Sequence, residues 1–61
     1  MIKFPGYYRI KFLHEAQTQD VRLVDRLQLA DGKILYFKGE DNAVYNADAI
    51  VWVKPIKDPN G

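Results

Sequence analysis

The chain has 61 residues, no cysteine, one histidine and a formal net charge of +1. A domain of this length is near the lower limit for unaided folding and buries only about 60% of the surface of its unfolded chain. The composition excludes disulfides and thiolate metal sites, and the balanced charge is not typical of a module that binds duplex DNA through its phosphates. The longest apolar run, 49–53, is far shorter than the ~20 residues of a membrane-spanning helix.

The pattern predicts one domain without targeting or membrane segments. Residues 1–56 are expected to form a small β domain, and residues 57–61 a flexible C-terminal tail. We expect a cytoplasmic protein with no metal, no cofactor and no small-molecule substrate.

The first predicted strand follows the turn at Pro5-Gly6. The segment YYRIKFL, residues 7–13, alternates between apolar and polar positions, which is typical of a half-buried strand. The alternation places Tyr8, Ile10 and Phe12 on one face and Tyr7, Arg9, Lys11 and Leu13 on the other.

Residues 21–40 are expected to form a hairpin around Asp31-Gly32. Asp-Gly between two alternating runs favours a two-residue type I′ turn, which fixes the register. In that register Leu27 faces Tyr36 and Asp25 faces Lys38, while Leu29 faces Ile34. The predicted core face consists of Leu23, Leu27, Leu29, Ile34 and Tyr36, and the outer face of Val24, Arg26, Gln28, Lys33, Leu35 and Phe37.

A helix over residues 21–30 is the alternative, which would make the fold α+β. Asp20 is a suitable N-cap and Gly32 a suitable C-terminal cap. Four of the five apolar positions in 21–30 fit a two-residue period, which favours the strand.

The last third of the chain predicts a turn at 39–42, a short strand near 43–45, a bend, and a final strand over 49–54. Both faces of the final strand are apolar, with Ile50 and Trp52 on one side and Ala49, Val51 and Val53 on the other. The chain therefore predicts an all-β fold, a small, strongly bent five-stranded antiparallel sheet or barrel of the SH3-like or Sm-like kind.

The segment VYNADAIVWVKP, residues 44–55, resembles the closing strands of Sm-like RNA-binding proteins, where a short strand, a bend and an A-I-x-x-V-x-P segment complete a barrel. The resemblance covers about a dozen positions, and it implies a barrel. The bend holds Asn46-Ala47-Asp48 where that family has basic and histidine residues around its RNA pore, so no RNA-binding residue carries over. The matching positions are Val44, Tyr45, Ala49, Ile50, Val53 and Pro55.

No catalytic pattern is present. The chain lacks serine, its one threonine, Thr18, lies in a polar loop, and His14 has no partner in the pattern. The four glycines match no phosphate-binding loop. The acidic residues 40, 41 and 48 match no cation-binding spacing. We therefore expect a protein that is not an enzyme.

Aromatic and basic side chains indicate a binding surface instead. We expect Tyr8, Phe12, Tyr36 and Trp52 in the core and Tyr7, Phe37 and Tyr45 at the surface. Such a surface, with aliphatic neighbours, favours a protein partner or a second copy of the chain, as for an adaptor, subunit or inhibitor. The alternative is single-stranded nucleic acid or RNA bound by the aromatic and basic members. The predicted partner-binding residues are Arg26, Gln28, Lys33, Leu35, Phe37, Tyr7, Arg9 and Lys11.

Overall fold

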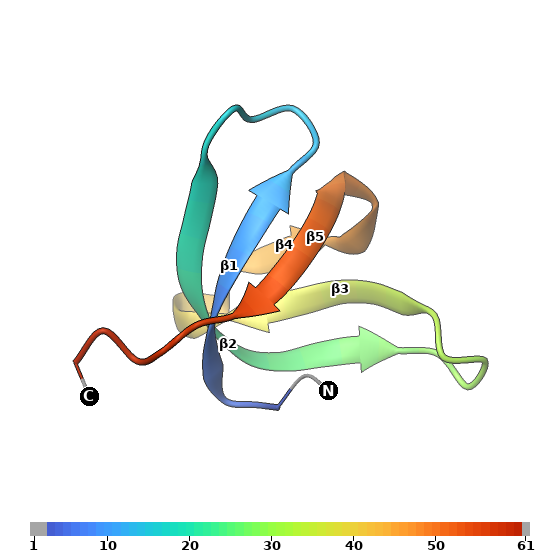
Figure 1. Ribbon diagram of the computed structural model, residues 1–61. Helices are drawn as coiled ribbons and strands as arrows, with labels where there is room; N and C mark the ends of the chain where they lie inside the picture. Colours follow the sequence, from blue (N-terminus) through green and yellow to red (C-terminus); the bar gives the residue numbers. More distant parts are fainter. Residues whose placement is uncertain (1–2, 61) are drawn as a thin grey trace.

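The computed structural model describes residues 3–60 and is all-β, with a single five-stranded antiparallel sheet (Figure 1). The segment 21–30 lies mainly in a strand, so the α+β alternative is wrong. The elements are β1 (Gly6–Phe12), β2 (Thr18–Gln28), β3 (Ile34–Gly39), the 3-10 turn η1 (Glu40–Asn42), β4 (Val44–Asn46), the 3-10 turn η2 (Ala47–Ala49) and β5 (Ile50–Pro55).

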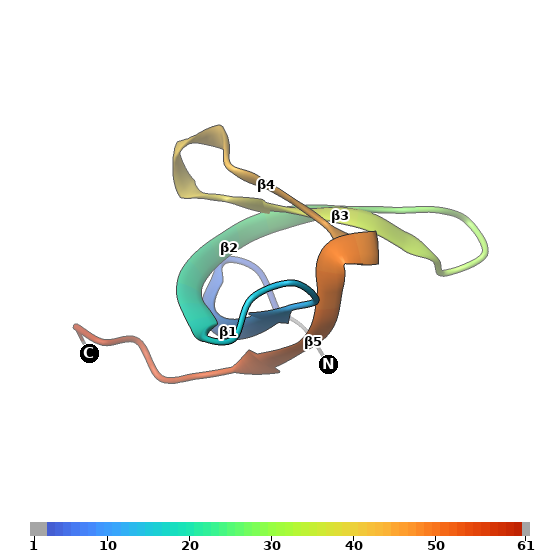
Figure 2. The same cartoon turned by 90° about the horizontal axis from the view of Figure 1, so that it is seen from above.

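The sheet has the strand order β4-β3-β2-β1-β5, and β2 belongs to both of its halves. The first part of β2 pairs with β1 and the second part pairs with β3. Figure 2 shows β2 curving from one half into the other, so that the β3–β4 half and the β1–β5 half lie on opposite sides. β4 and β5 are the two edge strands, so within residues 3–60 the sheet curls strongly but does not close.

Three β-bulges set the faces of the sheet. The register passes from Leu23↔Gly39 to Asp25↔Lys38, from Leu27↔Tyr36 to Gln28↔Ile34, and from Lys11↔Trp52 to Phe12↔Ile50. A bulge places two residues opposite one and so reverses the alternation beyond it. The extra residues are all aliphatic and exposed: Val24 (38%), Leu35 (39%) and Val51 (55%).

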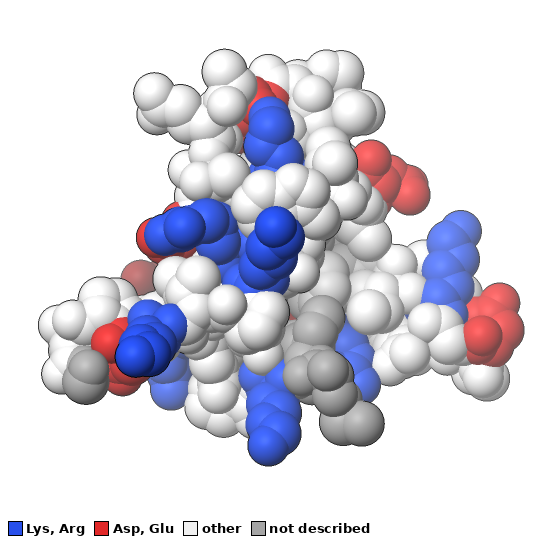
Figure 3. All heavy atoms as spheres, viewed as in Figure 1, with Lys and Arg blue, Asp and Glu red and all other residues white. Residues whose placement is uncertain are grey.

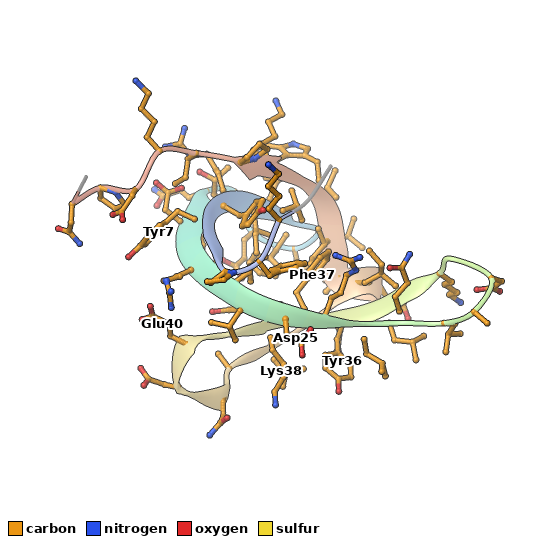
Figure 4. The ribbon with its side chains drawn as sticks, turned by 90° about the horizontal axis from the view of Figure 1, so that it is seen from below. Tyr7, Asp25, Tyr36, Phe37, Lys38 and Glu40 are labelled. Carbon is orange, nitrogen blue, oxygen red and sulfur yellow. The ribbon has the colours of Figure 1, made fainter. Side chains whose placement is uncertain are left out.

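The core lies inside the curl of the sheet. Its four buried hydrophobic side chains come from β1, β2 and β3: Tyr8, Ile10, Leu23 and Phe37. Figure 4 shows Phe37 pointing into the interior, whereas Tyr36 points away from it. Half-buried side chains complete the cluster: Phe4, Phe12, Val21, Ile34, Tyr45, Ile50 and Val53.

The bulge at Val24 explains why the predicted core face of the hairpin is partly wrong. Leu23 is buried and Ile34 packs against the core, as expected. Beyond Val24 the alternation is reversed, so Leu27 faces outward and Arg26 faces inward beside Phe37. The expected core positions of Tyr36 and Leu29 are wrong as well, and so is the exposed position expected for Phe37.

The hairpin turn has three residues rather than two. The Leu29 N–H donates to the Lys33 carbonyl (2.8 Å), and the Gly32 N–H donates to the Leu29 carbonyl (2.9 Å). Gly32 has φ +95°, in the region that favours glycine, whereas Asp31 is not among the positive-φ residues. The expected type I′ turn is therefore wrong, because the turn closes between Leu29 and Lys33. The expected pairing of Leu29 with Ile34 is wrong too, since Ile34 lies opposite Gln28, whereas the Leu27–Tyr36 and Asp25–Lys38 pairings are confirmed.

In the final strand, β5, the bulge at Val51 likewise reverses the alternation of side chains. Ile50 and Val53 both pack against the core, and Trp52 lies on the outer face opposite Lys11. The expected pairing of Ile50 with Trp52 on one face is therefore wrong, and so is the core position of Trp52. Tyr45, expected at the surface, packs against the core through Phe12, with 5.9 Å between ring centroids.

Gly39 lies in close contact with the Tyr45 ring. It is buried at the end of β3, and a Cβ there would lie 2.8 Å from Cε2 of Tyr45 and 3.4 Å from the Arg22 carbonyl oxygen. Gly39→Ala must displace the Tyr45 ring, so we expect a loss of about 1–3 kcal/mol in the free energy of unfolding. Urea denaturation followed by circular dichroism measures it. An unchanged midpoint would contradict this close packing.

Candidate binding surfaces

The outer face of β1 carries three of the sequence-predicted residues. Tyr8 and Ile10 are buried, so the alternate residues Tyr7, Arg9 and Lys11 face outward, as expected. Figure 4 shows Tyr7 pointing away from the interior. Tyr7 lies opposite Arg22 of β2.

β5 adds two residues to this face that sequence reasoning missed. Lys54 pairs with Arg9 and Trp52 pairs with Lys11 across the β1–β5 ladder. The side chains of directly opposite residues are neighbours on one face of a sheet, with Cβ atoms about 4.5–5.5 Å apart. Arg9, Lys11 and Lys54 therefore share one face of the sheet with the Trp52 ring. We call this group, Arg9, Lys11, Trp52 and Lys54, the basic block.

Each member of the basic block has a local contact. Arg9 makes two bonds to Asp20, Nε to Oδ1 at 2.8 Å and Nη2 to Oδ2 at 3.1 Å. Lys11 Nζ donates to the carbonyls of Phe12 and Glu15. Lys54 Nζ lies 4.6 Å from the centroid of the Trp52 ring, a cation–π contact.

The Arg9–Asp20 pair lies in solvent. The hydrogen bond from the Arg9 guanidinium lowers the pKa of Asp20 below its ordinary value, and the same bond raises the pKa of Arg9. The Asp20 carboxylate is therefore protonated, and loses its charged contact with Arg9, at lower pH than an unpaired aspartate would be. Because both side chains are about half exposed, water and salt screen the pair strongly.

Three other sequence-predicted residues lie on the inner face of the hairpin, which corrects the expected outer surface. Phe37 is 5% exposed and its ring centroid lies 6.2 Å from that of Phe4. The Arg26 guanidinium lies over Phe4 at 5.3 Å, and its Nε donates to Gln28 Oε1 at 2.9 Å. Gln28 Nε2 then donates to the Gly32 carbonyl at 2.9 Å. These contacts hold the hairpin to the core and to its own turn.

The outer face of the hairpin holds apolar and polar side chains in two rows across the strands. Leu27 of β2 lies opposite Tyr36 of β3, and Tyr36 lies opposite Asn46 of β4. A second row holds Asp25, Lys38 and Val44, and Figure 4 shows Asp25 and Lys38 on the same outer side as Tyr36.

Toward the turn the hairpin exposes further side chains. Leu29 (43%), Leu35 (39%) and the solvent-exposed Lys33 lie there, in a region that projects beyond the rest of the sheet (Figure 1). We call residues 27–36 the hairpin arm. The sequence prediction placed Lys33 and Leu35 correctly in this exposed region. It missed Leu27 and Tyr36 because it did not anticipate the bulges at Val24 and Leu35.

The described residues offer little else for chemistry. No group of three histidine or acidic side chains suited to a metal ion occurs in residues 3–60, and that part of the chain forms no ligand-sized pocket. His14 is exposed. The only helical segments are single 3-10 turns, so the described chain contains no helix with the length and apolarity to cross a membrane.

The β1–β5 face and the hairpin arm are thus the two surfaces with a distinct chemical character. Figure 3 shows Lys and Arg atoms gathered across the strands β1 and β5. The arm exposes three leucines, Leu27, Leu29 and Leu35, and part of Tyr36, beside the polar Asp31 and Lys33. Comparison with known proteins finds no matching family model, no matching curated protein and no matching solved structure.

Proposed function

We propose that this chain is a non-enzymatic protein-binding module whose hairpin arm inserts into an apolar groove of a larger protein. The observation that supports the proposal is the outward position of Leu27 and Tyr36, opposite one another on the arm. Large apolar patches at the surface of a small monomeric domain mark interaction sites, and tyrosine flanked by aliphatic side chains is typical of interface centres.

The shape of the molecule supports a groove as the binding site. A monomer of 7.1 kDa exposes about 4,100 Å² on average, whereas this chain exposes 4608 Å². The Cα radius of gyration is 11.3 Å, against about 10.5 Å for a compact domain of this length. A projecting arm contributes to both differences.

The available area favours a larger partner over a second copy. A stable interface buries about 800 Å² on each side, roughly a sixth of the surface of this chain. Flat self-pairing of the outer hairpin face would cover only the exposed parts of a few side chains. A groove that encloses the arm also covers its edges and its turn, including Leu29 and Leu35.

Photo-crosslinking tests the proposal. Benzoylphenylalanine replaces Tyr36 on the arm or, as a control, His14 in the exposed β1–β2 loop, and crosslinked proteins are identified from cells of the source organism. A protein captured from position 36 and not from 14 is then purified. We expect Leu27→Glu to weaken its binding at least tenfold, because the charge would be buried without a partner. Val51→Glu makes the same change on β5 and should leave affinity within about twofold.

Three outcomes would overturn the proposal. In the first, position 36 captures nothing beyond the control; in the second, the folded Leu27→Glu variant binds the purified partner as the original chain does. In the third, light scattering at micromolar concentration shows a dimer that Leu27→Glu dissociates, which would replace the larger protein by a second copy as the occupant of the arm.

A further inference from the structure

The basic block lies on the half of the sheet that does not contain the hairpin arm, and it indicates a second binding function. Arg9 and Lys54 are directly opposite in the β1–β5 ladder, and Lys11 follows Arg9 on the same face. Like charges in directly opposite positions destabilise a sheet. In the surrounding register only Asp20 offers a compensating carboxylate, and it pairs with Arg9. Three cations therefore share this face with one carboxylate, which binds Arg9 from the β2 side.

The charges of the molecule are segregated between its two halves. The net charge of +1 hides this, because it averages over both. The other half of the sheet and its turns contain five acidic residues against three cations, Arg26, Lys33 and Lys38, and so have an acidic excess; the five are Asp25, Asp31, Glu40, Asp41 and Asp48. The β1–β5 face is therefore complementary to an anion, although the whole chain is nearly neutral.

Trp52 specifies which anion fits. The indole lies on the outer face, and the amino group of Lys54 lies 4.6 Å from its centroid, so one ring face meets an exposed side chain rather than packed core. A flat base can take that position when Lys54 turns to a phosphate, since base stacking on an aromatic ring is stronger than an exposed cation–π contact. An acidic peptide has no equivalent group to stack there.

We propose that the basic block binds single-stranded nucleic acid, with a base stacked on Trp52 and phosphates held by Arg9, Lys11 and Lys54 from the same face of the sheet. A duplex keeps its bases stacked within the helix and cannot reach the ring. Side chains on one face of a strand are about 6.8 Å apart, so Arg9 and Lys11 can contact successive phosphates of an extended strand. The site is distinct from the 46–49 bend, where the Sm-like resemblance would place RNA.

The single tryptophan of the chain makes the test direct. Strands of about twelve thymidylates or uridylates, within the site sizes of small β domains, are titrated into the protein while Trp52 emission is recorded. Stacking should quench the emission with either strand. Three phosphate contacts predict that the logarithm of the association constant falls with the logarithm of salt concentration with a slope of about −2.

Charge-reversal variants on and off the basic block distinguish binding at this surface from a general effect of net charge. Lys54→Glu should weaken binding at least tenfold, while Lys38→Glu, the same change on the other half of the sheet, should alter it less than about twofold. Asp20→Asn should strengthen binding, because it removes the carboxylate that competes for Arg9. Trp52→Ala, measured by anisotropy of a labelled strand, should lose about tenfold and Trp52→Phe much less.

Several results would overturn the proposal: unquenched Trp52 emission at saturating strand, equal effects of Lys54→Glu and Lys38→Glu, or weaker binding by Asp20→Asn. Equal affinity for polyglutamate of the same charge would assign the face to an acidic protein, and equal affinity for a duplex would exclude base stacking. Leu27→Glu should leave the binding of single-stranded nucleic acid unchanged. The two proposed binding surfaces are therefore tested independently.

Discussion

Phe37→Ala is expected to remove about half or more of the stability of the fold at 25 °C. Phe37 is 5% exposed and packs with Phe4 inside the curl of the sheet. Truncating a buried phenylalanine costs about 3–5 kcal/mol, whereas a domain of 61 residues has a total stability of about 3–9 kcal/mol. With only four buried hydrophobic side chains in the described chain, no neighbouring cluster compensates for the loss.

The measurement is urea unfolding followed by far-ultraviolet circular dichroism and Trp52 emission. Leu35→Ala is the matched control, because Leu35 lies two residues away on the same strand and is 39% exposed. We expect the control to change the free energy of unfolding by about 0.5 kcal/mol or less. Equal midpoints for the two variants would place Phe37 at the surface, in conflict with the structure.

Much of the fold follows from local sequence signals. The alternation of residues 7–13 predicted β1 and the correct division of its side chains between core and solvent. Asp31-Gly32 placed the hairpin, and the pairings of Leu27 with Tyr36 and of Asp25 with Lys38 are confirmed. Period-two patterning carries this information because neighbouring side chains of a strand point to opposite faces.

The assignment of faces failed wherever a bulge intervened. One extra residue reverses the alternation for the rest of the strand, so a single missed bulge exchanges core and surface over several positions. This is why Phe37 and Arg26 were placed outside and Trp52 inside. Nothing in a period-two pattern marks a bulge directly, because its cost and its position depend on how the sheet must bend around its core.

The apolar runs nevertheless contain a partial signal. Val24, Leu35 and Val51 each follow or precede another apolar residue, and each is the extra residue of a bulge. An apolar run covering both faces of a strand in so short a chain thus has an explanation that requires no second core layer. In β5, for example, the bulge places Ile50 and Val53 against the core and leaves Val51 in solvent.

The same geometry explains why the candidate surfaces were only partly predicted. The extra residue of the β1–β5 bulge lies on β5, so Tyr7, Arg9 and Lys11 follow strict alternation along β1 and were placed correctly. Trp52 and Lys54 join them only through the β1–β5 pairing, a contact between segments some forty residues apart that local patterning does not contain. The basic character of that face is therefore a property of the topology.

Leu23→Ala and Leu27→Ala test the bulge at Val24 itself. Strict alternation places both leucines in the core, so it predicts similar losses of stability for the two variants. In the structure Leu23 is fully buried and Leu27 is 41% exposed. Leu23 also lies between Gly6 and Gly39 on the neighbouring strands, so no cross-strand side chain can relax into the space that truncation leaves.

We therefore expect Leu23→Ala to lose about 2–5 kcal/mol, toward the upper part of that range, because the cost grows with the residual cavity. Leu27→Ala should lose about 1 kcal/mol or less. Chemical denaturation of both variants in parallel gives the difference directly. Similar losses would mean that β2 keeps its alternation through Val24, and the outer face of the hairpin arm would then lose Leu27, the residue on which the proposed groove contact depends.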